Sequence, residues 1–220
     1  APLPPALAEA IDAAYANLSE RLGTRPTVAV RSSAVGEDTE ASFAGQYRSV
    51  LPVERDALAA AYKHVLASKY EPRAILYRLR YGLTDAATPM AAAVVVLVRA
   101  RASGVLYTVD AGRPASGQIR IDAAPGMGEN VVGGAASPDV FRIHRETLQV
   151  DRHLSASREG SGQDDPQPPS ISPSTARSLA ELSLKLEAHF GGPQDIEWAQ
   201  NEQGDVLILQ TRPLGLADAT

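Results

Sequence analysis

Near its carboxyl end the chain carries acidic, amide and guanidinium side chains that alternate with apolar ones. The stretch from Asp195 to Pro213 reads D-I-E-W-A-Q-N-E-Q-G-D-V-L-I-L-Q-T-R-P. This alternation predicts two β-strands, and Gln203 with Gly204 predicts a two-residue turn between them. We therefore expect a β-hairpin with one polar face.

The expected hairpin brings four side chains together that could do chemistry. Asp195 faces Arg212 and Glu197 faces Gln210, and all four share one face because side chains alternate along a strand. Directly opposed residues have Cβ atoms roughly 4.5–5.5 Å apart. Magnesium prefers oxygen ligands, which Glu197 and the Gln210 amide can supply, and the Arg212 guanidinium can bind phosphate oxygens. The other face would carry Ile196, Trp198, Leu209 and Thr211.

The same pattern also fits an ordinary hairpin with one solvated polar face, across which opposite charges pair. A bulge or a three-residue loop would shift the register and separate the facing pairs. The hairpin alone therefore does not distinguish a ligand site from a surface.

Two further segments contain groups that could bind an anion. Arg31 ends a short β-rich run and is followed by hydroxyl side chains and a glycine-bearing loop, so side chain and backbone N–H groups could grip phosphate together. The glycines around Glu129, in G-M-G-E-N, could place N–H donors near an anion. Taken alone, the first segment is better explained by a surface salt bridge of Arg31 with Glu37 or Asp38. A simple glycine turn explains the second segment equally well.

Composition limits the classes of partner. Lys plus Arg number 21 against 26 Asp plus Glu, a net charge of −5, so no global attraction to nucleic acid or anionic membranes is expected. The chain has no cysteine, which excludes disulfides and thiolate metal sites and favours a reducing compartment. No targeting segment is visible. We expect a cytoplasmic protein.

The elements expected to position these groups are helices and short strands in clusters. Apolar spacing predicts helices over residues 5–22, 56–68, 72–81 and 174–190. Short β-leaning runs cover residues 27–30, 90–98, 104–109, 118–123, 140–144 and 147–151. Strands clustered between helices favour an α+β fold. We expect an amino-terminal part over 1–89, with helices and the Arg31 loop, and a sheet-rich part over 90–220.

Four segments, taken in order, resemble the nucleotide-binding domain of the phosphoenolpyruvate synthase and pyruvate phosphate dikinase family, to which rifamycin phosphotransferases also belong. They are V-R-S-S-A-V-G-E-D-T-E-A-S-F-A-G-Q, A-S-G-V-L-Y-T-V-D, G-M-G-E-N-V-V-G-G, and D-I-E-W with L-Q-T-R-P. The resemblance covers about residues 7–213. It implies an ATP-grasp-like mixed sheet with flanking helices, and transfer of phosphate from ATP to a histidine on a separate, swivelling domain.

The resemblance also implies residue roles. Arg31 and Arg212 would be catalytic, holding the ATP phosphates and stabilising the charge in transit. Asp195 would orient Arg212 or a metal-bound water. The implied magnesium ligands are Glu197 and Gln210, and the implied nucleotide contacts include Thr108 and Glu129. ATP and Mg²⁺ would be the cofactors.

The sequence also departs from the family pattern. The family's upstream G-G-K segment, with its phosphate-binding lysine, has no counterpart before Arg31, and no histidine stands in the family's phospho-acceptor context. We therefore expect a fragment or remnant that is inactive alone and works with a phosphohistidine domain and a pyruvate-binding domain of a parent polypeptide. Two alternatives stay open: a related enzyme that phosphorylates rifamycin or glucan, and a non-catalytic nucleotide-binding module.

Overall fold

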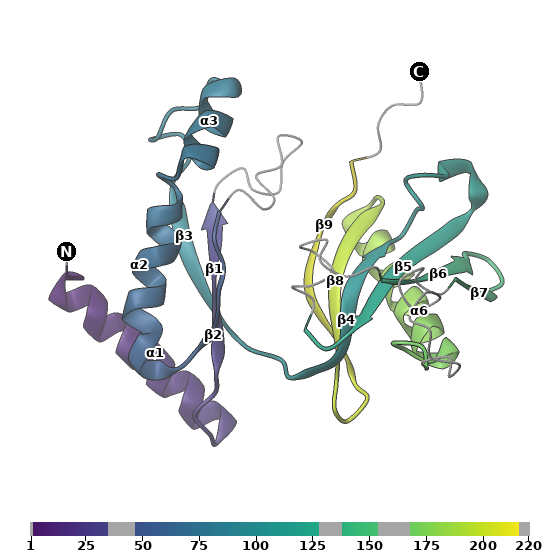
Figure 1. The fold of residues 1–220 in the computed structure, drawn as a ribbon, viewed down its shortest axis with the longest axis horizontal. Coiled ribbons are helices and arrows are strands. Elements are labelled where there is room, and N and C mark those ends of the chain that lie inside the picture. Colours follow the sequence, from purple (N-terminus) through teal and green to yellow (C-terminus); the bar gives the residue numbers. More distant parts are fainter. Residues whose placement is uncertain (1, 35–46, 128–137, 154–167, 216–220) are drawn as a thin grey trace, which may run out of the picture. The chain divides into compact units, whose positions relative to one another are not determined.

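The computed structural model describes residues 2–34, 47–127, 138–153 and 168–215. The chain divides into two compact units, Ala1–Leu97 and Val98–Thr220 (Figure 1). The sequence places a boundary at 89/90, whereas the structural division falls after Leu97, because the strand Met90–Val96 pairs within the first unit. No helix in the described ranges combines the length and apolarity needed to cross a membrane.

Unit 1 is a three-stranded antiparallel sheet with helices on one face (Figure 1). Its strand order is β2 (Val50–Val53), β1 (Val28–Ala34) and β3 (Met90–Val96). The helices are α1 (Pro5–Leu22), α2 (Leu58–Ser68) and α3 (Pro72–Arg80). The core joins α1, α2 and the sheet through Tyr15, Val28, Val30, Val53, Leu58, Ala61 and Val65.

The helix ends of unit 1 follow from local chemistry. Pro5 and Pro72 occupy the first turns of α1 and α3, where a missing N–H removes no helical hydrogen bond. Gly23 ends α1 with φ of 66°, a left-handed conformation that glycine adopts without a steric penalty. The helix predicted over residues 5–22 is therefore confirmed.

Unit 2 is a six-stranded antiparallel sheet covered on one face by a long helix (Figure 1). The strand order is β7 (Val150–His153), β6 (Asp139–His144), β5 (Gln118–Pro125), β4 (Ala100–Tyr107), β8 (Gln194–Asn201) and β9 (Val206–Pro213). The covering helix is α6 (Pro173–Phe190). Its Leu179, Ala176 and Ala180 pack on alternate strand residues that include Leu106, Ile119, Ile121, Phe141, Ile143, Ile196 and Trp198.

The expected α+β class is confirmed, and two details are corrected. Every strand pair between the described residues is antiparallel, so the expected mixed sheet is not found there. Strand β1 continues to Ala34, so Arg31 lies inside a strand and not at its end. Pairing with β3 extends as far as Ala34, which overrides the loop tendency of the two serines. Strand β2 was not predicted.

Gly104 allows β4 and β5 to approach closely. A Cβ atom on Gly104 would lie 1.9 Å from the backbone oxygen of Asp122. Strand β4 is a central strand, paired with both β5 and β8, so the backbone has little room to shift. The glycine in A-S-G-V is therefore required by packing between strands.

We expect Gly104→Ala to lower the free energy of unfolding by about 1–3 kcal/mol or more, because overpacking forces the backbones apart. Denaturant melts measure this difference. Gly192→Ala is the matched control, since nothing lies within 4 Å of a Cβ there. Equal stability of the two variants would show that the close approach is not a constraint.

An ion pair connects the segment after β6 to α6. Arg145 donates from Nη2 to Oε1 of Glu187 at 2.5 Å and from Nη1 to Oε2 at 3.1 Å. Burial alone would raise the pKa of Glu187, but the hydrogen bonds from Arg145 and Thr108 outweigh burial and lower the pKa below its ordinary 4.5. The ionised form of Glu187 therefore stabilises the fold.

The contribution of Glu187 should be complete above pH 4.5 and disappear as pH falls through its lowered pKa, because the unfolded chain takes up the proton first. Thermal or urea melts of the wild type and Glu187→Gln should therefore differ most near neutral pH and converge in acid. A difference that stays constant with pH would contradict this assignment.

Candidate functional site

The hairpin of β8 and β9 forms the pairs expected from the sequence. Asp195 lies opposite Arg212, and Glu197 lies opposite Gln210. Because facing residues of an antiparallel pair point to the same side, the four side chains share one face of the sheet. Trp198 is fully buried in the core on the other face, as predicted.

The predicted two-residue turn is nevertheless wrong. The Asn201 N–H donates to the carbonyl of Asp205 at 3.0 Å, which leaves a three-residue loop whose Gly204 has φ of 92°. A bulge then shifts the register, so that Trp198 faces Ile208 while Glu197 still faces Gln210. Loop and bulge each change the register by one residue, and the two changes cancel at the polar pairs.

The bulge also corrects the expectation for Leu209. Leu209 is the extra residue of β9 between the partners of Glu197 and Trp198, and it is 46% exposed. It therefore does not join Trp198 in the core as the alternation predicted. A bulge interrupts the alternation because one residue of the strand has no partner.

Arg212 and Asp195 form a close, partly buried ion pair. Arg212 donates from Nε to Oδ2 of Asp195 at 2.8 Å, and its Nη2 lies 2.7 Å from the same oxygen. The other carboxylate oxygen, Oδ1, is buried and has no hydrogen-bond partner among the residues that the structure describes. A guanidinium has five N–H donors, so the pair leaves Arg212 with donor capacity while fixing its orientation.

Surrounding charge keeps Arg212 cationic. Burial would lower the pKa of Arg212, but the carboxylates of Asp195 and Glu197 outweigh burial and raise it. The hairpin therefore presents a fixed positive charge beside carboxylate and amide oxygens. Such a combination suits an anion that carries a hard cation, as a nucleotide phosphate does.

The polar face continues beyond the hairpin onto β4 and β5. Tyr107 lies opposite Asp195 on one side and Arg120 on the other. Burial, together with the nearby carboxylates of Asp195 and Asp122, raises the pKa of Tyr107. The phenol therefore stays protonated at neutral pH and can donate a hydrogen bond.

Two more arginines on this face are held by carboxylates. Arg120 binds Asp122 from Nε and Nη2 at 2.8 and 2.9 Å, and Arg142 lies opposite Arg120 on β6. The Nε of Arg142 donates to Oδ2 of buried Asp110 at 3.2 Å. Arg120 and Asp122 contribute to the charge around Tyr107, and neither arginine pair was predicted from the sequence.

Thr108 does not join this face. It is fully buried, and its hydroxyl accepts the backbone N–H of Gln194 at 2.9 Å. Its carbonyl accepts a hydrogen bond from Arg145, which also binds Glu187 of α6. Thr108 thus fixes the residue before Asp195, and its expected contact with the nucleotide stays a prediction.

The two remaining expected residues lie elsewhere. Arg31 is in unit 1, where it is partly buried and faces Ala93 of β3, whereas the hairpin residues belong to unit 2. Glu129 lies outside the described residues. The roles of both stay predictions.

The donor set of the hairpin fits a magnesium ion. Mg²⁺ binds through one or two carboxylates together with substrate phosphates and water. Glu197 and Gln210 supply two facing oxygen donors, and the unpartnered Oδ1 of Asp195 lies in the next facing pair. Across the described ranges, no group of three or more His, Cys, Asp or Glu side chains could hold a metal by itself.

Comparison with known proteins connects this site to a family. Residues 1–220 match the family model described as pyruvate phosphate dikinase, AMP/ATP-binding domain. The chain is 36% identical over 231 residues to a probable phosphoenolpyruvate synthase of Methanocaldococcus jannaschii, covering 97% of this chain and 19% of the relative. It is 36% identical over 240 residues to phosphoenolpyruvate synthase of Escherichia coli, covering 96% of this chain and 30% of that protein.

A third relative has a different name. Rifampicin phosphotransferase of Streptomyces sviceus is 38% identical over 231 residues, covering 96% of this chain and 26% of the relative. The chain thus spans between about a fifth and a third of the length of these relatives. The match to the family model extends over all 220 residues, and the chain therefore belongs to the AMP/ATP-binding domain family of pyruvate phosphate dikinase.

Proposed function

We propose that the chain binds ATP with Mg²⁺ and passes phosphate to a histidine on another domain of a longer polypeptide, in an enzyme of the phosphoenolpyruvate synthase type. The observation that carries the proposal is the two facing pairs, Asp195 with Arg212 and Glu197 with Gln210, on the face opposite α6. Family membership and the names of two relatives support the same reading.

The proposed chemistry is electrostatic. Phosphoryl transfer passes through a loose transition state, in which catalysis consists mainly of positioning and charge stabilisation. Arg212, oriented by Asp195, would donate its remaining N–H groups to phosphate oxygens, and Arg31 would contribute a second guanidinium. Bound Mg²⁺, held by Glu197 and Gln210, would neutralise phosphate charge.

Other roles belong to the same proposal. Thr108 and Glu129 would lie near the nucleotide, as the family resemblance implies. Tyr107 would donate a hydrogen bond on the same face, since it lies opposite Asp195. The phospho-acceptor histidine and a pyruvate-binding domain would be parts of the longer polypeptide. A cytoplasmic location is also proposed, because the chain contains no cysteine.

A second acceptor deserves a test. The identity to rifampicin phosphotransferase, 38%, is similar to that found with the phosphoenolpyruvate synthases. An ATP-binding domain binds the same nucleotide whatever the final phosphate acceptor is. Its residues therefore do not indicate which acceptor the intact polypeptide uses. Assays of the intact polypeptide with pyruvate and with rifampicin would separate the two.

We expect Arg212→Ala and Arg31→Ala each to weaken ATP binding about ten- to hundredfold, the effect of losing a charge-assisted hydrogen bond. Glu197→Gln should instead reduce the gain in affinity that Mg²⁺ provides. Isothermal titration of the intact polypeptide with ATP, with and without Mg²⁺, measures both effects.

Matched controls test the position of each charge. Glu202→Gln changes an exposed carboxylate in the loop of the same hairpin. Arg177→Ala changes an exposed arginine of α6, the helix that covers the sheet face opposite the polar pairs. Arg25→Ala changes an exposed arginine of unit 1. The proposal fails if the site variants bind MgATP as tightly as these controls.

The isolated 220-residue chain should not form phosphohistidine, because the proposed acceptor lies on another domain. Incubation with ATP labelled at the γ-phosphate, followed by detection of acid-labile label, measures this. The intact polypeptide is the positive control. Acid-labile label on any of the four histidines of the isolated chain, His64, His144, His153 or His189, would contradict the proposal.

A further inference from the structure

Strand β3 lies at an edge of the sheet that the described residues form in unit 1. In unit 1 it pairs with β1 on one side and, among the described strands, with none on the other. It is seven residues long and consists only of Met, Ala and Val. Val95 and Val96 are 45% and 41% exposed. A long, apolar, uncharged edge is a ready template for another strand.

The other three sheet edges carry the protective features that β3 lacks. Strand β2 has four residues and includes Pro52, which cannot donate to an added strand. Strand β7 also has four residues and includes charged Asp151. Strand β9 contains the bulge at Leu209 and ends at Pro213. This contrast indicates that another strand covers the edge of β3 in the intact polypeptide.

The hydrogen-bonding groups of this edge alternate in a known order. The Leu97 N–H donates to the carbonyl of Thr27 at 2.9 Å, next to the end of β3. In an antiparallel pair every second residue directs its N–H and C=O toward the partner. Val95 therefore bonds toward β1, whereas Val94 and Val96 direct their backbone groups away from it.

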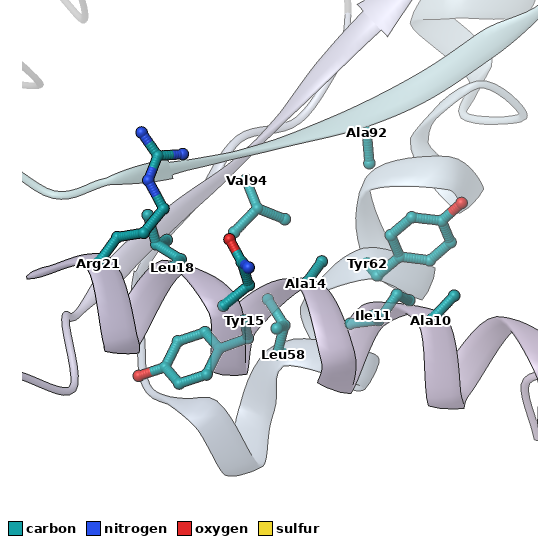
Figure 2. A pocket seen from close by; sticks show the side chains of 11 residues that line it. Ala10, Ile11, Ala14, Tyr15, Leu18, Arg21, Leu58, Tyr62, Ala92 and Val94 are labelled. Atoms are coloured by element: carbon teal, nitrogen blue, oxygen red, sulfur yellow. The ribbon is translucent and has the colours of Figure 1, made fainter.

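The core of unit 1 is also open on the side of β3. Val28 and Val30 of β1 are fully buried, but Val94, opposite Val30, is only partly buried. A groove of about 480 Å³ borders this strand, lined by residues of α1, α2 and β3 and by none of β1 or β2. Figure 2 shows Val94 and Ala92 beside α1, with Arg21 and Tyr62 toward opposite ends.

We propose that an extended segment of the longer polypeptide pairs with β3 as a fourth strand of this sheet. Alternate side chains of that strand would enter the groove beside α1, and they would be large and apolar to fill it. This inference rests on the proposed function only in assuming that the chain works within a longer polypeptide. The relatives, of which it spans 19% and 30%, supply the length needed.

A second copy of the chain fits this groove less well. If two β3 strands paired, the visiting strand would direct Ala92 and Val94 into the groove, because these face the core side of their own sheet. Such small side chains leave much of the groove empty, and unfilled apolar space forfeits packing energy. The extended segment is therefore the assigned occupant.

Hydrogen exchange tests the proposal without nucleotide, so its outcome is independent of ATP binding. Single-residue exchange is measured by fragmentation mass spectrometry on the 220-residue chain and on the intact polypeptide. The Val94 and Val96 amides should exchange at least about tenfold more slowly in the intact polypeptide, because exchange reports the opening of hydrogen bonds. The Val95 amide, bonded to β1 in both, should change less.

Three outcomes would overturn the proposal. One is equal exchange of Val94 and Val96 in the two polypeptides. The second is protection in the isolated chain that rises with concentration together with dimer formation, which would assign the edge to a second copy. The third is an intact gene product that consists of these 220 residues alone and in which the Val94 and Val96 amides are unprotected.

A pair of variants keeps the test valid if the isolated chain folds poorly. In the intact polypeptide, Val96→Pro removes one outward N–H, and Val96→Thr is the β-branched control that retains it. Val96→Pro should accelerate exchange at Val94 at least about tenfold relative to Val96→Thr, by loss of the added pairing. Equal exchange in the two variants would contradict strand addition.

Discussion

Arg212 donates a hydrogen bond from Nε to Oδ2 of Asp195 and holds Nη2 2.7 Å from the same oxygen, and this ion pair joins β9 to β8. The ion pair exists only because β8 and β9 pair in one register. A shift of one residue would turn Arg212 toward the core side and Asp195 away from its partner. The facing pair of Glu197 and Gln210 depends on the same register, so a register shift would disrupt both polar pairs together.

The two faces of the unit 2 sheet differ in chemical character: one is apolar and packs against α6, and the other is polar and charged. The face under α6 contains the apolar core and also the buried Thr108, whose hydroxyl anchors the start of β8. The opposite face carries the arginine and carboxylate pairs around Tyr107. Because strand residues alternate, one sequence can specify a rigid support and a charged surface at once. The Arg145 and Glu187 pair ties the helix to the same anchor.

Unit 1 shows how a sheet can be stable and still incomplete. Its core residues Val28 and Val30 are fully enclosed, whereas the groove beside β3 leaves Val94 partly exposed. The groove borders β3, and no described strand lies beyond β3. Apolar edges of this kind are rarely left uncovered in natural proteins, and the relatives are three or more times as long as the chain.

Local pattern alone determined the helices, most of the strands and the candidate residues of the hairpin. Helical spacing and capping predicted α1 and α6 to within a residue, because these signals act over a few neighbours along the chain. The polar alternation of Arg120 and Asp122 with Ile119 and Ile121 could also have revealed the second set of charges. That pattern says only that one face is polar, and not which strand lies beside it.

Tertiary structure decided the rest. The bulge at Leu209 compensates the longer loop, and it forms because the buried Trp198 and the facing polar pairs both have to keep their sides of the sheet. Tyr107 meets Asp195 across strands far apart in the sequence, and Thr108 turns to the buried side to hold Gln194. Such pairings depend on the packing of the whole sheet against α6. That packing is cooperative, so it cannot be predicted from any short stretch of the sequence.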